Sequence, residues 1–152
     1  MPIADYCRRD VRTIAQGETL RAAARAMESE GVGSLVVLEG SHPCGIVTDR
    51  DVALWVLHDG LDADSTTLQE VVPPDPTVVH GNSHLRVAAG VMRRSALRRL
   101  IVVDERDQLL GIIALDDLVP LISDELAGIA AIMRSQRTGA PTPSTNPQGV
   151  SA

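Results

Sequence analysis

The sequence has almost no aromatic residues and no lysine. Aromatic residues make up 1% of its 152 residues, with one Trp, one Tyr and no Phe. The core must therefore be aliphatic, and a flat ligand would lie against Val, Ile, Leu and Ala side chains instead of stacking on rings. All 14 basic residues are arginines. The absence of lysine excludes a P-loop lysine and a Schiff-base lysine.

Charge, cysteine content and hydrophobic runs exclude further classes of protein. A formal net charge of −6 argues against general nucleic-acid binding, which needs a basic face. Cys7 and Cys44 form no CxxC or metal-type pattern. No apolar run approaches the ~20 residues of a membrane span, and the N-terminus has no signal-peptide character. We expect a soluble, cytoplasmic protein that binds neither nucleic acid nor a membrane. Its thiols are expected to be reduced, with a redox pairing of Cys7 and Cys44 as the alternative.

The chain consists of two copies of one unit. Four residues of an apolar helical pattern recur 65 positions later, namely Leu20, Ala23, Ala24 and Met27 as Leu85, Ala88, Ala89 and Met92. The apolar runs 35–38 and 100–103 each lead through a turn into a second match, 45–51 and 111–117, at an offset of 66. An internal repeat has to be identified first because it determines the fold. Function is therefore expected where the two copies face each other.

Each copy predicts the order strand, helix, strand, strand, helix. Strands are expected at 11–14, 35–38, 45–47, 77–79, 100–103 and 111–114. The first helix of each copy is capped by Thr19 and by Ser83 or a neighbour, and the second helices are expected at 51–57 and 116–122. This gives repeat 1 at 1–60, repeat 2 at 61–125 and a C-terminal helix at 126–134. The segment 135–152 is rich in Pro, Ser, Thr and Gly and is predicted to be disordered.

A tandem strand–helix–strand–strand–helix pair that closes on Gly45-Ile46-Val47-Thr48-Asp49-Arg50-Asp51 resembles the CBS domain pair, or Bateman module. The Ile3-Ala4-Asp5 segment and His58-Asp59-Gly60-Leu61-Asp62 are similar to small stand-alone bacterial CBS proteins of the hypoxic-response type. The resemblance covers roughly residues 1–125. It implies an α+β fold of two CBS repeats packed as a Bateman module.

The resemblance also implies a ligand. In such families the cleft between two CBS units binds adenosine compounds such as AMP, ADP, ATP or S-adenosylmethionine. We call the matched segments 45–51 and 111–117 the Gly-motif of each repeat. In such families the Asp of this motif holds ribose hydroxyls, and its Thr or Ser lies near phosphate. Here this implies Asp51 as the ribose ligand and Thr48 as a phosphate or ribose contact. Repeat 2 keeps Asp117 but has Ala114 in place of the hydroxyl, so the ligand is expected to prefer the Thr48/Asp51 site.

Further ligand contacts come from the lead-in to the second strand of repeat 2. Arg98 and Arg99 resemble the basic lead-in that many nucleotide-binding CBS units present to phosphate, and guanidinium groups match phosphate oxygens bidentately. The counterpart in repeat 1 includes the uncharged Ser34. The expected ligand-binding set is completed by Thr13, Ser34 and Val78.

Several of these residues have a structural explanation that needs no ligand. Asp51 and Asp117 each open a helix, where a carboxylate caps backbone amides. Arginines 93 and 94 fit a solvated helix face. His80 and His84 stand four apart, but Gly81 and Asn82 between them disfavour a helical metal site. No base is aligned with a nucleophile, so no catalytic residue is expected.

These observations favour a non-enzymatic regulatory module that senses an adenosine nucleotide (AMP, ADP or ATP) and requires no cofactor. With no attached enzyme or channel, its output would be an unidentified partner protein or a change in self-association. The resemblance implies a homodimer through helix faces around 52–56 and 118–122. The alternative is a structural or partner-binding CBS pair whose nucleotide sites are vestigial.

Overall fold

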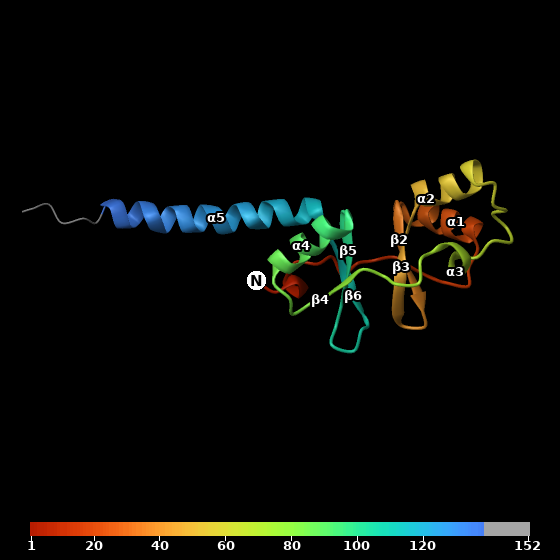
Figure 1. Ribbon diagram of the computed structural model, residues 1–152, viewed down its shortest axis with the longest axis horizontal. Coiled ribbons are helices and arrows are strands. Elements are labelled where there is room, and N and C mark those ends of the chain that lie inside the picture. Colours follow the sequence, from red (N-terminus) through yellow and green to blue (C-terminus); the bar gives the residue numbers. More distant parts are fainter. Residues whose placement is uncertain (139–152) are drawn as a thin grey trace, which may run out of the picture. The chain divides into compact units, whose positions relative to one another are not determined.

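The computed structural model describes residues 1–138 (Figure 1). Met1–Leu118 forms one compact unit, and a second unit begins at Val119. None of the helices within residues 1–138 is long and apolar enough to cross a membrane.

The helices and strands follow the predicted order in both repeats. Repeat 1 consists of β1 (Thr13–Ala15), α1 (Leu20–Glu30), β2 (Ser34–Glu39), β3 (His42–Thr48), α2 (Asp49–Ala53) and the π-helical segment η2 (Leu54–His58). Repeat 2 consists of β4 (Val78–His80), α4 (Leu85–Ser95), β5 (Arg99–Val103), β6 (Leu109–Ala114) and α5 (Leu115–Thr138). Two short helices, η1 (Ile3–Asp5) and α3 (Leu68–Val71), were not expected from the sequence.

The two sheets have the same topology. β2 is the central strand of the first sheet and pairs parallel with β1 and antiparallel with β3. β5 occupies the same place between β4 and β6. Even the register shift recurs, between Val37 and Leu38 in β2 and between Val102 and Val103 in β5. The sequence repeat is therefore a structural repeat.

The central strands contain continuous apolar runs, at 35–38 and 100–103, because both of their faces are covered there. Leu35 and Val37 belong to a core cluster with Leu20 of α1. Val36, whose side chain alternates to the other face, clusters instead with Ile101 of β5. The sheets of the two repeats thus pack on each other, and α1 and α4 lie on their outer faces (Figure 1).

The first residues of the chain pack on repeat 2, although they precede repeat 1 in sequence. The backbone N–H of Ile3 donates to the carbonyl of Ser83 at 2.9 Å, and that of Ala4 donates to Gly81 at 2.8 Å. The Ile3 side chain is fully buried. The N-terminal segment is therefore part of the second repeat's structure.

Repeat 1 receives the equivalent segment from the linker. The N–H of Leu68 donates to the carbonyl of Glu18 and that of Gln69 to Gln16, both at 2.9 Å. These donors and acceptors lie 65 positions from those of the N-terminal segment. The boundary placed between residues 60 and 61 therefore follows the order of the chain but not its packing, because each repeat is completed by the segment that precedes the other.

The C-terminal helix departs from the expectation in two ways. α5 runs from Leu115 to Thr138 without interruption, so the helix expected at 126–134 is present and continues the one expected at 116–122. Residues 135–138 are helical where disorder was predicted. Leu118 is 1% exposed and belongs to the core, so the expectation that it contributes to a dimer surface is wrong. The rest of the predicted disordered tail lies outside the described residues.

Candidate functional site

The first cavity opens between the two repeats and has a volume of about 570 Å³. Repeat 1 contributes Thr48 and Asp51, and repeat 2 contributes Thr77, Arg98 and Arg99. Its remaining walls come from both repeats and from the linker, with Cys44, Gly45, Ile46, Val72, Pro73, Asp75, Pro76, Ser95, Leu97 and Ile101. The cavity lies within the size range of small-molecule sites and brings together four of the residues expected to bind ligand.

Thr48 and Asp51 are held by a capping box at the start of α2. The Thr48 Oγ1 accepts a hydrogen bond from the Asp51 backbone N–H at 3.1 Å, and the Asp51 Oδ2 accepts one from the Thr48 N–H at 2.9 Å. This reciprocal pairing fixes both side chains. The other carboxylate oxygen of Asp51, Oδ1, has no hydrogen bond to any residue of 1–138. Capping therefore accounts for the Oδ2 atom of the Asp51 carboxylate and leaves the Oδ1 atom available to a ligand.

The two arginines at the start of β5 are not equivalent. The Arg98 Nη2 donates to the Asp116 Oδ1 at 3.1 Å, an ion pair between two exposed side chains. Arg99 makes no side-chain hydrogen bond or ion pair within the described part of the chain. The sequence could not separate the two residues, but in the structure Arg99 is the cation without a partner.

The second cavity, of about 380 Å³, lies at the corresponding place in repeat 2. Ser34 and Asp117 line it together with Arg99, which also lines the first cavity. Its other walls carry many charges, from Arg8, Asp10, Arg12, Glu30 and Asp116, alongside Val11, Val32, Ile112 and Ala114. The expected Asp117 site therefore exists as a cavity, but a smaller and more charged one.

Both carboxylate oxygens of Asp117 already accept hydrogen bonds from other groups of the protein. Its Oδ1 accepts a hydrogen bond from Arg8 Nη2 at 2.9 Å, and its Oδ2 accepts one from the Ala114 backbone N–H at 3.2 Å. The nearby Arg12 Nε lies 3.0 Å from Glu30 Oε2. Both oxygens of Asp117 are thus in use, whereas Asp51 has one to spare.

Two of the expected ligand contacts lie away from both cavities. Val78 of β4 packs in the cluster that joins the two sheets, with Val36 and Ile101. Thr13 of β1 is exposed and is absent from the lining of either cavity. The sequence placed these residues on the correct strands, but it could not say which way their side chains point.

The structure adds Arg8 and Thr77 to the candidate residues. Thr77 follows the proline-rich linker and directly precedes the expected contact Val78, so the sequence indicated this part of the chain but not the residue that lines the cavity. The place of Arg8 depends on the backbone pairing of its residue with Ile112 of β6, and no local pattern in the sequence indicates that pairing.

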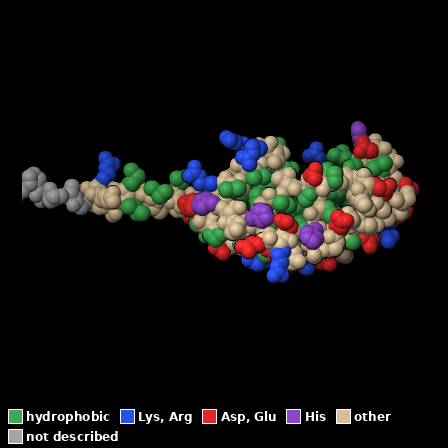
Figure 2. Space-filling view, turned by 60° about the horizontal axis from the view of Figure 1, so that its bottom comes forward, with side chains coloured by type: hydrophobic (Ala, Val, Ile, Leu, Met, Phe, Trp, Pro, Cys, Tyr) green, Lys and Arg blue, Asp and Glu red, His purple; other side chains and the backbone are tan. Residues whose placement is uncertain are grey.

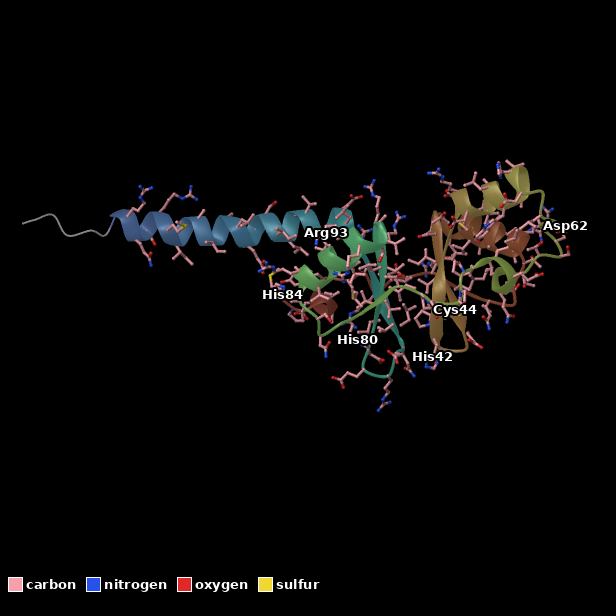
Figure 3. All side chains as sticks on the ribbon, in the orientation of Figure 1. His42, Cys44, Asp62, His80, His84 and Arg93 are labelled. Atoms are coloured by element: carbon pink, nitrogen blue, oxygen red, sulfur yellow. The ribbon has the colours of Figure 1, made fainter. Side chains whose placement is uncertain are left out.

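His80 and His84, which stand four apart, contact different protein groups. Figure 3 shows His80 and His84 as separate side chains, and each has its own partner. The Nδ1 of His80 lies 3.3 Å from the carbonyl of Asp104, and the Nδ1 of His84 accepts a hydrogen bond from the Arg86 N–H at 3.2 Å. Within residues 1–138 no group of three His, Cys, Asp or Glu side chains is placed to hold a metal ion.

Cys44 lines the first cavity, and both cysteines are free thiols. Burial raises the pKa of the Cys44 thiol above its ordinary value, and the negative charge of Glu39 raises it further. Burial likewise raises the pKa of the Cys7 thiol. Because the thiolate is the reactive form, neither residue has the environment of a reactive cysteine.

Known proteins share this sequence pattern and this architecture. The chain is 35% identical over 129 residues to the CBS domain-containing protein YhcV of Bacillus subtilis, covering 84% of this chain and 91% of YhcV. It is 30% identical over 118 residues to the uncharacterized protein MK0525 of Methanopyrus kandleri, covering 77% of this chain but only 60% of that protein.

Among solved structures, Hypoxic Response Protein I with two coordinated zinc ions superposes with a TM-score of 0.69 at 28% identity, covering 79% of this chain and 98% of that one. The chain is also 30% identical over 115 residues to Hypoxic response protein 1 of Mycobacterium tuberculosis, covering 75% of this chain and 80% of that protein. The CBS domain protein PAE2072 from Pyrobaculum aerophilum, complexed with AMP, superposes with a TM-score of 0.71 at 26% identity, covering 84% and 99%.

The sequence profile of the CBS domain matches residues 3–58 and 68–124. These ranges begin at η1 and α3, the two segments that the repeats exchange. The tandem α+β repeat inferred from the sequence is confirmed, and the chain belongs to the CBS domain family, with two CBS domains in tandem.

Proposed function

We propose that this protein is a non-enzymatic regulatory module that binds an adenosine nucleotide, such as AMP, ADP or ATP, in the first cavity. The observation that carries the proposal is the meeting of two kinds of group in one cavity. Asp51 of repeat 1 offers a carboxylate oxygen to ribose hydroxyls, and Arg99 of repeat 2 offers an unpaired guanidinium to phosphate. The AMP complex of the similar protein PAE2072 supports the choice of ligand.

The first cavity suits a nucleotide better than the second does. A carboxylate can accept hydrogen bonds from two vicinal hydroxyls, and Asp51 retains an oxygen for this purpose. Asp117 would first have to give up its ion pair with Arg8. Binding in the second cavity therefore carries the cost of breaking a charge-assisted interaction, and the first cavity is the proposed primary site.

Calorimetry with AMP on two matched variants tests the assignment. Asp51→Asn keeps an oxygen that can accept the Thr48 N–H, so α2 stays capped while the charge is lost. Asp117→Asn makes the same change in the second cavity. Hydrogen bonds to charged groups contribute ~1.5–3 kcal/mol, so Asp51→Asn should weaken AMP binding about tenfold or more. Asp117→Asn should leave the affinity within twofold, and the reverse order of effects would contradict the assignment.

The second candidate function is a partner-binding CBS pair with no nucleotide ligand. The pairing of Asp117 with Arg8 and of Arg12 with Glu30 favours this reading for the second cavity. A thermal-shift panel of AMP, ADP, ATP, NAD and S-adenosylmethionine distinguishes the two functions. Stabilisation by an adenosine nucleotide supports the sensor, whereas no shift with any compound at millimolar concentration supports the partner-binding pair.

We also propose that the module is a homodimer, joined in part by the face of η2. Leu54 is 47% exposed and Leu57 84% exposed, and apolar side chains of this size exposed together indicate a contact surface. Light scattering of the full chain at micromolar concentration should give twice 16.2 kDa. A single 16.2 kDa species in wild type would contradict the dimer.

A further inference from the structure

The part of α5 that follows Leu118 carries an exposed apolar stripe. Residues at alternating spacings of three and four form the stripe, which we call the α5 seam, namely Val119, Ile122, Leu126, Ile129 and Met133. All but Ile122 are more than half exposed, with values between 56% and 62%. Figure 2 shows hydrophobic side chains along this helix.

The spacing of the seam is that of a coiled coil. A strict alternation of three and four keeps an apolar residue in register every 3.5 residues, which is the heptad pattern of helices that pack side by side. In proteins most of the stability of a helix comes from packing its apolar face. No described residue covers the exposed side chains of the seam, so a second helix is required to do so.

The charges along α5 indicate what kind of helix fits. Asp116 and Asp117 lie in the first turn of α5, and Arg137 lies in its last turn. Two copies side by side in parallel would place like charges together. Two antiparallel copies in register at Leu126, the centre of the seam, would place the acidic first turn of each helix against the basic last turn of the other, and a self-complementary contact of this kind closes as a two-fold dimer.

We propose that the α5 seam pairs antiparallel with the α5 seam of a second copy of this chain. This contact is separate from the η2 face of the proposed module homodimer and does not depend on nucleotide binding. Residues 119–138 carry the α5 contact and lie outside the compact unit of residues 1–118. The α5 contact can therefore form in addition to the η2 contact and would reinforce the module homodimer.

Two matched variants of the full chain test the pairing. Ile129→Asp places a charge in the middle of the seam, and Ala131→Asp places the same charge two residues away on the opposite face. Sedimentation over 1–100 µM should show that Ile129→Asp raises the dissociation constant for self-association at least tenfold, with Ala131→Asp within twofold of wild type. Far-UV circular dichroism checks that both variants stay folded.

Hydrogen exchange gives a readout that does not depend on the η2 face. In wild type, the amides of residues 122–136 should become more protected as protein concentration rises, and Ile129→Asp should abolish that dependence. Exchange that is independent of concentration in wild type would overturn the proposal, as would capture of the helix by lipid vesicles without self-association.

Salt dependence tests the antiparallel orientation. Added salt screens charges, so it should weaken an antiparallel pair of unlike ends and strengthen a parallel pair of like ends. Asp116→Arg and Arg137→Glu should each weaken the antiparallel pair at low salt, and the double variant should restore it. In a parallel pair each residue lies beside the same residue of the other copy, so a reversed charge would still meet a like charge. Unchanged affinity in both single variants would therefore overturn the antiparallel orientation.

Discussion

The two cavities are the same site built twice with different side chains. Each is lined by the Gly-motif of one repeat and by residues from the other repeat and its preceding segment. At the repeat offset of 65, Pro73, Thr77 and Ser95 of the first cavity correspond to Arg8, Arg12 and Glu30 of the second. The first set is uncharged and the second set is charged, so the repeat preserves the position of the site and changes its size and chemistry.

The consequence of this exchange appears at the two aspartates. Asp51 and Asp117 both accept a hydrogen bond from the backbone N–H three residues earlier. Where Arg8 adds an ion pair to Asp117, the corresponding Pro73 offers nothing to Asp51. The availability of each carboxylate is therefore decided by a residue from the segment that precedes the other repeat, and not by the Gly-motif itself.

The largest expected difference between the repeats concerns their motif glycines. A Cβ on Gly111 would lie 2.3 Å from the backbone carbonyl oxygen of Arg8, whereas one on Gly45 would lie 2.6 Å from Cγ1 of the Val72 side chain. A backbone atom held in strand pairing cannot move aside, but a valine side chain can rotate. Gly111→Ala should cost about 3 kcal/mol of unfolding free energy and Gly45→Ala about 1 kcal/mol, as measured by urea denaturation. Equal costs would show that the N-terminal segment yields as easily as a side chain.

Much of the fold follows from the sequence because two periodicities are clear, the 65-residue internal repeat and the spacing of apolar residues within each element. The offset of 65, the helical spacing of Leu20 and Met27 and the apolar runs of the central strands predict the order of elements that the structure has. The exchange of η1 and α3 between repeats was not predicted, because it depends on backbone hydrogen bonds such as that from Ile3 to Ser83, which leave no pattern in side-chain type.

The site was predictable to a similar extent. Thr48, Asp51 and the two arginines belong to one cavity, as the Gly-motif and the basic lead-in suggested. The sequence could not show that Asp116 pairs with Arg98 and leaves Arg99 unpaired, because adjacent residues of the same type are distinguished only by which way they point. The sequence also could not show that Thr13 and Val78, expected as ligand contacts, lie outside the lining of both cavities.

Arg98 and Arg99 should differ in their effect on nucleotide binding. Arg99→Ala should weaken AMP binding about tenfold, because a charge-assisted hydrogen bond to phosphate contributes ~1.5–3 kcal/mol. Arg98→Ala should weaken it less than threefold, because Arg98 is paired with Asp116. Adenosine, which has no phosphate, is the control ligand and should bind both variants like wild type. Equal losses for the two variants would mean that Arg98 leaves Asp116 when the ligand binds.

A smaller difference lies at the ends of the equivalent helices α1 and α4. Gly31 ends α1 with φ of 64°, and Ala96, its counterpart, ends α4 with φ of 53°. A left-handed conformation costs a residue with a Cβ ~1–2 kcal/mol, whereas glycine adopts it freely. Ala96→Gly should therefore stabilise the protein by about 0.5–1 kcal/mol, after allowance for the entropy that glycine adds to the unfolded chain. Gly31→Ala should destabilise it by about 1 kcal/mol, and thermal unfolding of both variants checks the opposite signs.

The smallest effect expected is a difference in acid sensitivity between the repeats. Three carboxylates in the segment that completes repeat 1 have a lowered pKa. Backbone N–H groups of Asp64 and Ser65 hydrogen-bond Asp62, Arg21 hydrogen-bonds Asp64, and the Thr67 backbone N–H hydrogen-bonds Glu70. In repeat 2 only Asp104 has a lowered pKa among the described residues, through the backbone N–H groups of Gln108 and Arg106.

A carboxylate whose pKa is lower in the folded state stabilises the fold above its unfolded pKa of about 4. That contribution disappears as the pH falls through the lower, folded pKa. Below about pH 4, repeat 1 should therefore lose amide protection before repeat 2, while neither should change between pH 5 and pH 7 because of these groups. The effect is small because the carboxylates are fully exposed and screened by solvent. Asp62→Asn, which removes the charge but can still accept a hydrogen bond, should reduce the difference between the repeats, and equal loss of protection at every pH in wild type would show that these turns do not limit the acid stability of repeat 1.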